Sequence, residues 1–93
     1  MKFANNGIRP DDILSDDQST TTINGIEVRK GSIAAFLKNI DIIEDHFAPE
    51  QHKLDAVQIM KDLAPAVVAA GLHKHAIFRN KIVQDILDKE SSK

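Results

Sequence analysis

The sequence predicts a mainly α-helical fold with a small β element, in which an N-terminal β-hairpin is followed by a compact bundle of three or four helices. Three observations support this class. Asn24-Gly25 lies between short β-branched segments, apolar residues then recur at spacings of three and four, and two Ala-Pro steps mark helix starts further along the chain.

The hairpin is predicted by its turn. A type I′ turn needs positive φ at two consecutive residues, and Asn24 and Gly25 tolerate that conformation best. The arms are residues Thr20–Ile23 and Ile26–Arg29, which are rich in β-branched side chains. Because an isolated two-stranded ribbon is only marginally stable in water, we expect another element to cover one of its faces.

A helix is predicted directly after the hairpin. Gly31 allows the chain to turn sharply after the hairpin, and the hydroxyl of Ser32 is expected to cap the first turn of the helix. One face of this helix is apolar: Ile33, Phe36, Leu37, Ile40, Ile43 and Phe47. We expect this face to cover the hairpin.

The second helix is predicted to begin at Pro49-Glu50, because proline suits the first helical turn and pushes the residue before it out of the α region. Its inner side is expected to carry Leu54, Val57, Met60, Lys61 and Ala64. Pro65 predicts a third, short helix over residues 66–70, ended by Gly71 as an αL cap. Alternatively, the second and third helices form one rod that is kinked at Pro65.

The last helix is expected over residues 77–90. Its apolar stripe would contain Phe78, Ile82, Ile86 and either Val83 or Leu87. Alternatively, Asn80 is the N-cap of this helix, and residues 72–79 form a third strand beside the hairpin.

The chain is expected to form one domain over residues 20–90. Residues 1–19 read as a flexible acidic tail, in which Ile13-Leu14 could form one helical turn when docked, and residues 91–93 are expected to fray. The aspartates of this tail lack the spacing of a calcium-binding loop.

Composition and motifs argue against several functions. The chain has no Cys and a net charge of -2, and no apolar run is long enough to span a membrane or to act as a secretory signal. This pattern predicts a cytoplasmic protein without a membrane association. Phosphate-cradling glycine loops and nucleophile motifs are absent from the sequence, which predicts a protein that is not an enzyme and needs no cofactor.

The four histidines do not predict a metal site. Only His73 and His75 are close in sequence, and they would share a side only in an extended segment.

An acidic cluster is a candidate partner-binding site. Asp41, Glu44 and Asp45 fall at the C-terminal end of the first long helix, where the helix macrodipole disfavours negative charge. A basic group is therefore expected to approach them. The candidates within the chain are Lys53, Arg79 and Lys81, and the alternative is a partner protein.

Residues 67–79 resemble the helix-turn-helix of lac-repressor-type regulators, in which a small residue and glycine precede an aliphatic turn residue. The resemblance implies that Gly71 makes the turn and that Leu72 and Ile77 belong to the core, while Phe78 falls on the side that faces solvent or DNA. It also implies that His73, Lys74, His75 and Arg79 face the groove of the nucleic acid. Lys81 extends this candidate nucleic-acid-binding surface, because residues 63–84 contain no acid. No resemblance to a family extends over the full length of the chain.

The leading hypothesis is a small non-enzymatic protein that acts through protein-protein contacts and forms a homodimer. Apolar residues outside the main stripes suggest more hydrophobic surface than a small core can enclose. These residues are Ala34, Ala35, Ile42, Val67, Val68 and Leu87. The unpaired edges of the hairpin offer a second route to self-association. DNA binding through residues 71–81 is the alternative hypothesis.

Overall fold

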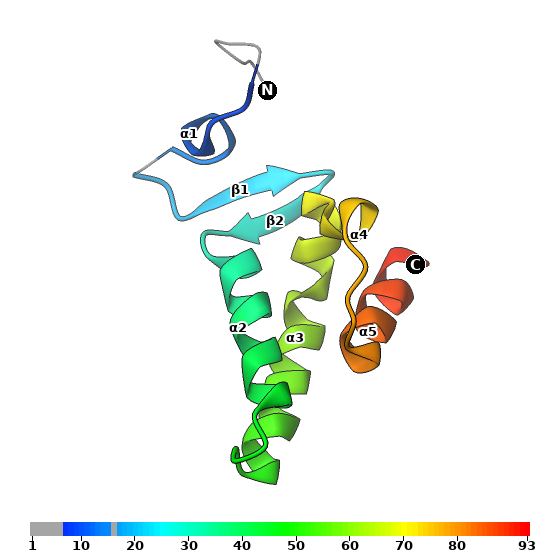
Figure 1. The fold of residues 1–93 in the computed structure, drawn as a ribbon. Helices are drawn as coiled ribbons and strands as arrows, with labels where there is room; N and C mark the ends of the chain where they lie inside the picture. Colours follow the sequence, from blue (N-terminus) through cyan, green and yellow to red (C-terminus); the bar gives the residue numbers. More distant parts are fainter. Residues whose placement is uncertain (1–6, 16) are drawn as a thin grey trace.

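A computed structural model describes residues 7–15 and 17–93. In chain order its elements are α1 (Pro10–Ile13), β1 (Thr20–Ile23), β2 (Ile26–Arg29), α2 (Ser32–Glu44), α3 (Glu50–Ala70), α4 (Leu72–His75) and α5 (Lys81–Ser91) (Figure 1). The predicted class, a hairpin followed by helices, is confirmed. Within the predicted tail, residues 1–6 and 16 lie outside the described residues, and α1 supplies one helical turn close to the place expected.

The hairpin forms with the predicted arms and turn. β1 and β2 pair antiparallel, with Thr20 opposite Arg29 and Ile23 opposite Ile26. Asn24 has a φ of 50° and Gly25 a φ of 79°, the pair of positive values that a type I′ turn requires. The register places Val28, which is buried, on the same face as Ile23 and Ile26.

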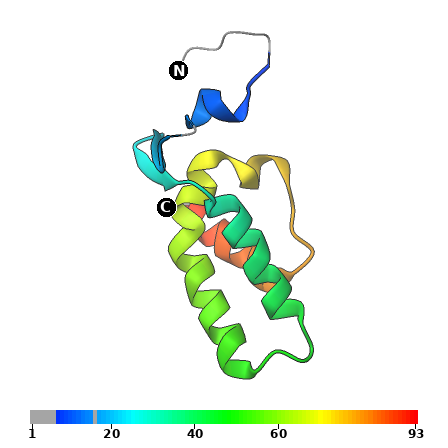
Figure 2. The same cartoon turned by 90° about the vertical axis from the view of Figure 1, so that its left-hand side faces the viewer.

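The hairpin packs on α3, which contradicts the expectation that α2 covers it. Strand β2 contacts α3, and Asn24 donates a hydrogen bond from Nδ2 to the carbonyl oxygen of Ala69 at 3.4 Å. Figure 2 shows the hairpin beside the C-terminal end of α3, whereas α2 leads away from it. The apolar face of α2 is used against α3, the helix that runs back alongside it.

The start of α2 differs from the prediction. Gly31 is the N-cap, in the left-handed conformation at a φ of 86°, and Ser32 is the first helical residue. The Ser32 hydroxyl donates to the carbonyl oxygen of Arg29 at 2.7 Å, so it ties the helix start to β2 instead of capping a helical amide.

The predicted stripe of α2 is right in its centre and wrong at two positions. Phe36 is fully buried, and Ile33, Ile40 and Ile43 pack around the core. Leu37 is 42% exposed and Phe47 is 96% exposed. Helix α2 ends at Glu44, so Phe47 lies in the loop and no longer follows the helical period.

Helix α3 is one continuous helix that contains Pro65, so the separate helix predicted over residues 66–70 is wrong. An interior proline removes a hydrogen bond and costs about 3 kcal/mol, which the contacts of α3 with α2, α5 and β2 offset. Gly71 ends the helix in the αL conformation, as predicted. On the predicted inner side Met60 and Ala64 are buried, whereas Leu54 and Lys61 are exposed.

The core lies between α2, α3 and α5. Its buried members are Phe36, Met60, Ala64, Val67, Val83, Ile86 and Leu87. Phe78 packs edge-on against Phe36, with ring centroids 6.1 Å apart. Val67 and Leu87 are fully buried, so the expectation that they are surplus surface residues is wrong.

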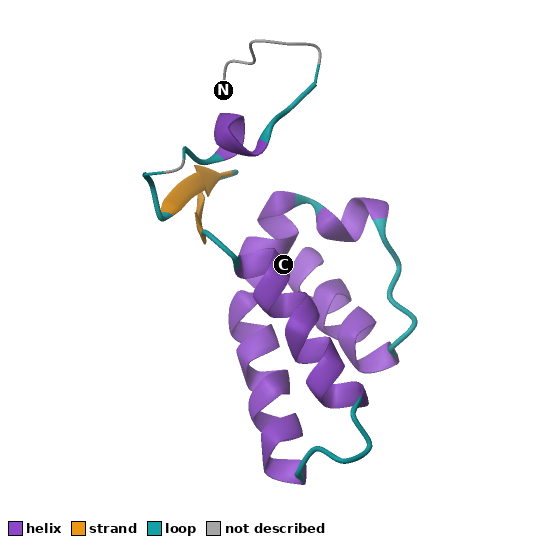
Figure 3. Cartoon of the chain, turned by 60° about the vertical axis from the view of Figure 1, so that its left-hand side comes forward, coloured by secondary structure: helices purple, strands orange, loops and turns teal. Residues whose placement is uncertain are grey.

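For the C-terminal part, the alternative prediction with Asn80 as N-cap and a third strand over residues 72–79 is confirmed in one respect only. Asn80 is the N-cap of α5, but residues 72–79 are not a third strand, because Leu72–His75 form α4 and the sheet of the described residues contains only β1 and β2 (Figure 3). None of the described helices combines the length and the apolar character that crossing a membrane requires.

Candidate functional site

The predicted acidic cluster lies at the C-terminal end of α2, and the in-chain bases named for it do not approach it. Asp41 is 3.9 Å from the Nζ of Lys38, in a pair whose side chains are 83% and 73% exposed. Lys81 pairs instead with Asp85 at 3.5 Å, and Lys53 and Arg79 form no ion pair with any described residue. Most of the negative charge of this cluster therefore faces solvent.

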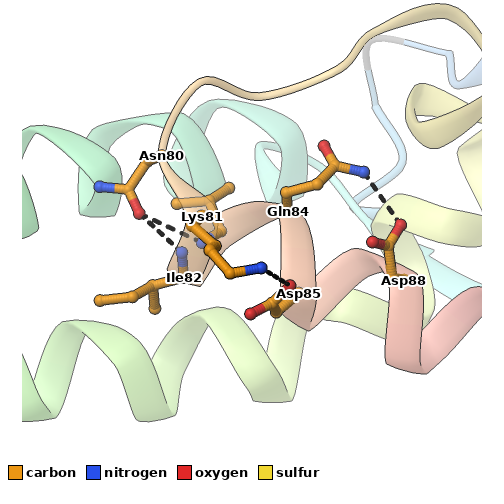
Figure 4. A network of polar contacts seen from close by, with 7 residues as sticks. Asn80, Lys81, Ile82, Gln84, Asp85 and Asp88 are labelled. Atoms are coloured by element: carbon orange, nitrogen blue, oxygen red, sulfur yellow. Dashed lines mark hydrogen bonds and ion pairs between the residues drawn. The ribbon is translucent and has the colours of Figure 1, made fainter.

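Glu44 contacts an amide instead of a base. Asn80 Oδ1 accepts from the backbone amides of Ile82 and Val83 at 3.0 and 3.3 Å, and its Nδ2 donates to Glu44 Oε2 at 3.3 Å. Figure 4 shows the two capping bonds together with the Lys81–Asp85 pair. One side chain thus caps α5 and links its start to the end of α2.

Asp45 shapes the loop between α2 and α3. Its Oδ1 accepts from the backbone amide of Phe47 at 2.9 Å, and its carbonyl oxygen accepts from the amide of Ala48 at 3.2 Å. These two bonds fold the loop back on itself directly before Pro49. The turn holds Phe47 away from the core, and its side chain is 96% exposed.

A groove lies at this end of the molecule, between the last turns of α2 and the first turns of α3. We call residues 39–59 the tip and this depression the tip groove, which encloses about 460 Å³. Its apolar lining includes Ile42, Phe47, Ala56 and Ile59, and its polar lining includes Asn39, Asp45, His52 and Asp55. No lysine or arginine among the described residues lines it.

A larger groove of about 630 Å³ runs between α3 and α5, and its charge is balanced. Its lining carries the cations Lys61, Lys89 and Lys93 and the anions Asp85, Asp88 and Glu90. Two of these anions are already paired, Asp85 with Lys81 and Glu90 with Lys93. The two grooves therefore differ in net charge: the lining of the smaller is acidic and that of the larger is neutral overall.

The segment that resembles a helix-turn-helix does not form its second helix. The resemblance implies a second helix after the turn at Gly71, with Ile77 in the core, but α4 ends at His75 and the chain then continues without helix to Asn80. The expected orientations are also reversed, because Ile77 is 88% exposed and Phe78 packs on Phe36.

The basic residues of this segment lie on different elements. His73, Lys74 and His75 share the single turn of α4, Arg79 lies on the connector, and Lys81 begins α5. His73 Nδ1 is buried and has no hydrogen-bond partner among the described residues. No three His, Asp or Glu side chains of the described residues are arranged to hold a metal ion.

Sequence reasoning placed the acidic cluster but missed the tip groove. The sequence places Phe47 in the predicted apolar stripe because it follows Ile43 by four residues. A second signal pointed the other way: Pro49 disfavours helix at Ala48, which puts the helix end close to Phe47 and removes the reason to count this ring as part of the buried face. Ile59 and His52 gave no comparable signal, because only the pairing of α2 with α3 brings them beside Ile42.

In comparisons with known proteins, no protein-family model, no curated protein and no solved structure matched this chain.

Proposed function

We propose that this protein is a small non-enzymatic interaction domain and that the tip groove is its contact surface. The observation that carries the proposal is Phe47, an aromatic ring that is 96% exposed beside an apolar groove. Ile42 and Ile59 line the same groove and are 38% and 47% exposed.

The energetics of apolar burial support this proposal. Removing one large apolar side chain from water stabilises a complex by about 1.5–3 kcal/mol before the costs of association. Contact surfaces obtain most of their affinity from a few aromatic or aliphatic anchors near the centre of the patch. Phe47 has the properties of such an anchor, and its hydrogen-bonded turn limits the entropy that is lost when a partner binds.

Self-association is a separate part of the proposal and uses another surface. Each strand of a two-stranded sheet has one edge that no other strand of the sheet pairs with. Two copies could join there, strand to strand. Light scattering at micromolar concentration tests this part, because a mass of two chains supports it and a mass of one chain contradicts it.

Capture from extracts of the native cell tests the contact surface. Tagged wild-type protein is compared with Phe47→Ser, and Ile77→Ser is the matched control, because Ile77 is 88% exposed and does not line the tip groove. The proposal expects at least one protein that wild type and Ile77→Ser both capture and Phe47→Ser does not. It is wrong if the Phe47 substitution leaves the captured set unchanged.

Binding of nucleic acid by the basic segment is the second proposal. It is supported by uncompensated positive charge, because residues 63–84 contain no acid and Lys74 and Arg79 form no ion pair with a described residue. Random duplex DNA at low salt is the probe, and the double variant Lys74→Glu, Arg79→Glu should lose the binding. Failure of the wild-type protein to bind ends this proposal.

A further inference from the structure

We infer that the tip groove takes a cationic amphipathic helix of a partner protein. This inference rests on the proposed function and adds the chemistry of the partner. Two features of the tip carry it: the charge around the groove and the shape between α2 and α3.

The tip concentrates the negative charge of the chain. Residues 39–59 contain five carboxylates and one lysine, a net charge of -4 against -2 for the whole chain, so the remaining residues together carry +2 with histidine neutral. The five carboxylates are Asp41, Glu44, Asp45, Glu50 and Asp55, and all of these residues are exposed. The end of α2 and the start of α3 contribute helix dipoles of opposite sign, so the side chains decide the sign of the local field.

The partners already present leave this charge available. The Lys38–Asp41 pair is long and largely exposed, so solvent screens it strongly. Asp45 and Asp55 accept hydrogen bonds from a backbone amide and from Gln51, neither of which carries charge. A lysine or arginine of a partner would therefore meet carboxylates that no cation in the described part of the chain neutralises fully.

The position of the groove between two helices suits a helical partner. The groove lies between two helices that a five-residue connection, residues 45–49, turns back on each other. An amphipathic helix binds such a groove through apolar anchors at spacings of three and four residues. Ile42, Ile59 and Phe47 would contact these anchors, and the flanking carboxylates would contact basic residues at the edges of the helix.

The negative charge of the tip also favours a cationic helix over the other occupants that could cover the groove. A second copy on a two-fold axis would bring two sets of tip carboxylates together, which is repulsive. Anionic lipid surfaces and nucleic-acid phosphates are repelled in the same way. A cationic segment is the occupant for which both the apolar and the charged groups of the tip are favourable.

A designed peptide pair tests the inference. The probe is a helix-forming peptide of about 18 residues, or about five turns, with lysines on one face and leucines and one tryptophan on the other. The second, anionic peptide of the pair has glutamate in place of each lysine and the same apolar face. Because the protein contains neither Trp nor Tyr, the tryptophan emission reports the environment of the peptide alone.

Two triple variants with equal changes in net charge locate the site. Asp41→Asn, Asp45→Asn, Asp55→Asn changes the net charge of the tip from -4 to -1, and asparagine at position 45 keeps an acceptor for the Phe47 amide. Asp62→Asn, Asp85→Asn, Asp88→Asn is the matched control, because none of these three lines the tip groove. We expect the tip variant to bind the cationic peptide about tenfold more weakly and the control to bind it nearly as wild type does, since each exposed charge pair changes a binding constant by a small factor.

The expected result is a saturable shift of the tryptophan emission with the cationic peptide, absent with the anionic one and weakened in Phe47→Ser. Equal binding of both peptides, equal weakening by the two triple variants, or no saturable signal up to about 1 mM peptide overturns the inference. A protein-dependent association with anionic vesicles, in place of the peptide, also overturns it. If Phe47→Ser still abolishes capture from cell extracts in any of these cases, the proposed function stands and only the charge assignment fails.

Discussion

Two phenylalanines near α2 show how differently the two ends of this molecule are built. Phe36 is fully buried among Met60, Val83 and Leu87, whereas Phe47, eleven residues later, is 96% exposed. The first belongs to a region in which α2, α3 and α5 enclose a core. The second belongs to the tip, which α2 and α3 form without a third helix.

Helix lengths explain the difference. Helix α3 has 21 residues and α5 has 11, so at the helical rise they measure about 31 and 16 Å. Helix α5 can cover only part of α3, and Figures 1 and 2 both show α2 and α3 extending beyond it. The tip groove therefore keeps apolar residues exposed, because α5 does not cover it.

The largest expected effect tests the enclosed region. Phe36→Ala should lower the free energy of unfolding by about 3–5 kcal/mol, because it leaves a cavity in a core without exposed members. Urea unfolding followed by circular dichroism measures it, with Phe36→Leu as the milder control. A loss below about 1 kcal/mol would show that this region is packed no better than the tip.

Gly71→Ala tests the C-terminal end of α3, which lies opposite the tip. The φ of Gly71 is 94°, and an added Cβ would meet no atom within 4 Å, so the cost is torsional only. We expect a loss of about 1–2 kcal/mol in the free energy of unfolding. Gly71→Asn should lose less, because asparagine tolerates the αL region. Equal losses for both substitutions would mean that a steric clash, and not the backbone torsion, sets the cost.

Asn80→Ala tests the border between the two regions. Removal of the cap from α5 should cost about 1 kcal/mol in the same unfolding measurement, and Asn80→Ser should retain most of that stability because its hydroxyl keeps an acceptor without adding a charge beside Glu44. Glu44→Gln should change the free energy of unfolding by less than about 0.5 kcal/mol, since its contact is exposed. A larger effect of Glu44→Gln would assign the stability to the link with α2 and not to the cap.

The smallest expected effect is at the tip itself. Phe47→Ala should leave the free energy of unfolding within about 0.5 kcal/mol of wild type, because this ring is exposed and the substitution keeps the backbone amide that Asp45 accepts from. Differential scanning calorimetry of Phe36→Ala and Phe47→Ala measures the difference in stability between the two variants directly. A loss at Phe47 close to that at Phe36 would remove the distinction between the regions.

Much of the local structure followed from the sequence. The turn at Asn24-Gly25, the start of α3 after Pro49 and the αL cap at Gly71 depend on the torsional preferences of one or two residues, so neighbours in sequence suffice to predict them. The same holds for the position of Asp41, Glu44 and Asp45 at the end of α2, because it depends only on where that helix ends.

Tertiary structure decided which surfaces meet. Whether α2 or α3 supports the hairpin, whether Pro65 ends a helix, and whether Phe47 is buried depend on contacts between segments far apart in the chain. Packing against α2 and α5 outweighs the cost of one interior proline, and no periodicity within α2 reveals that α5, whose start is linked to Glu44, leaves the tip groove uncovered. The sequence thus determined the elements and their ends, because torsional preferences act locally, and long-range packing decided which apolar residues were left exposed.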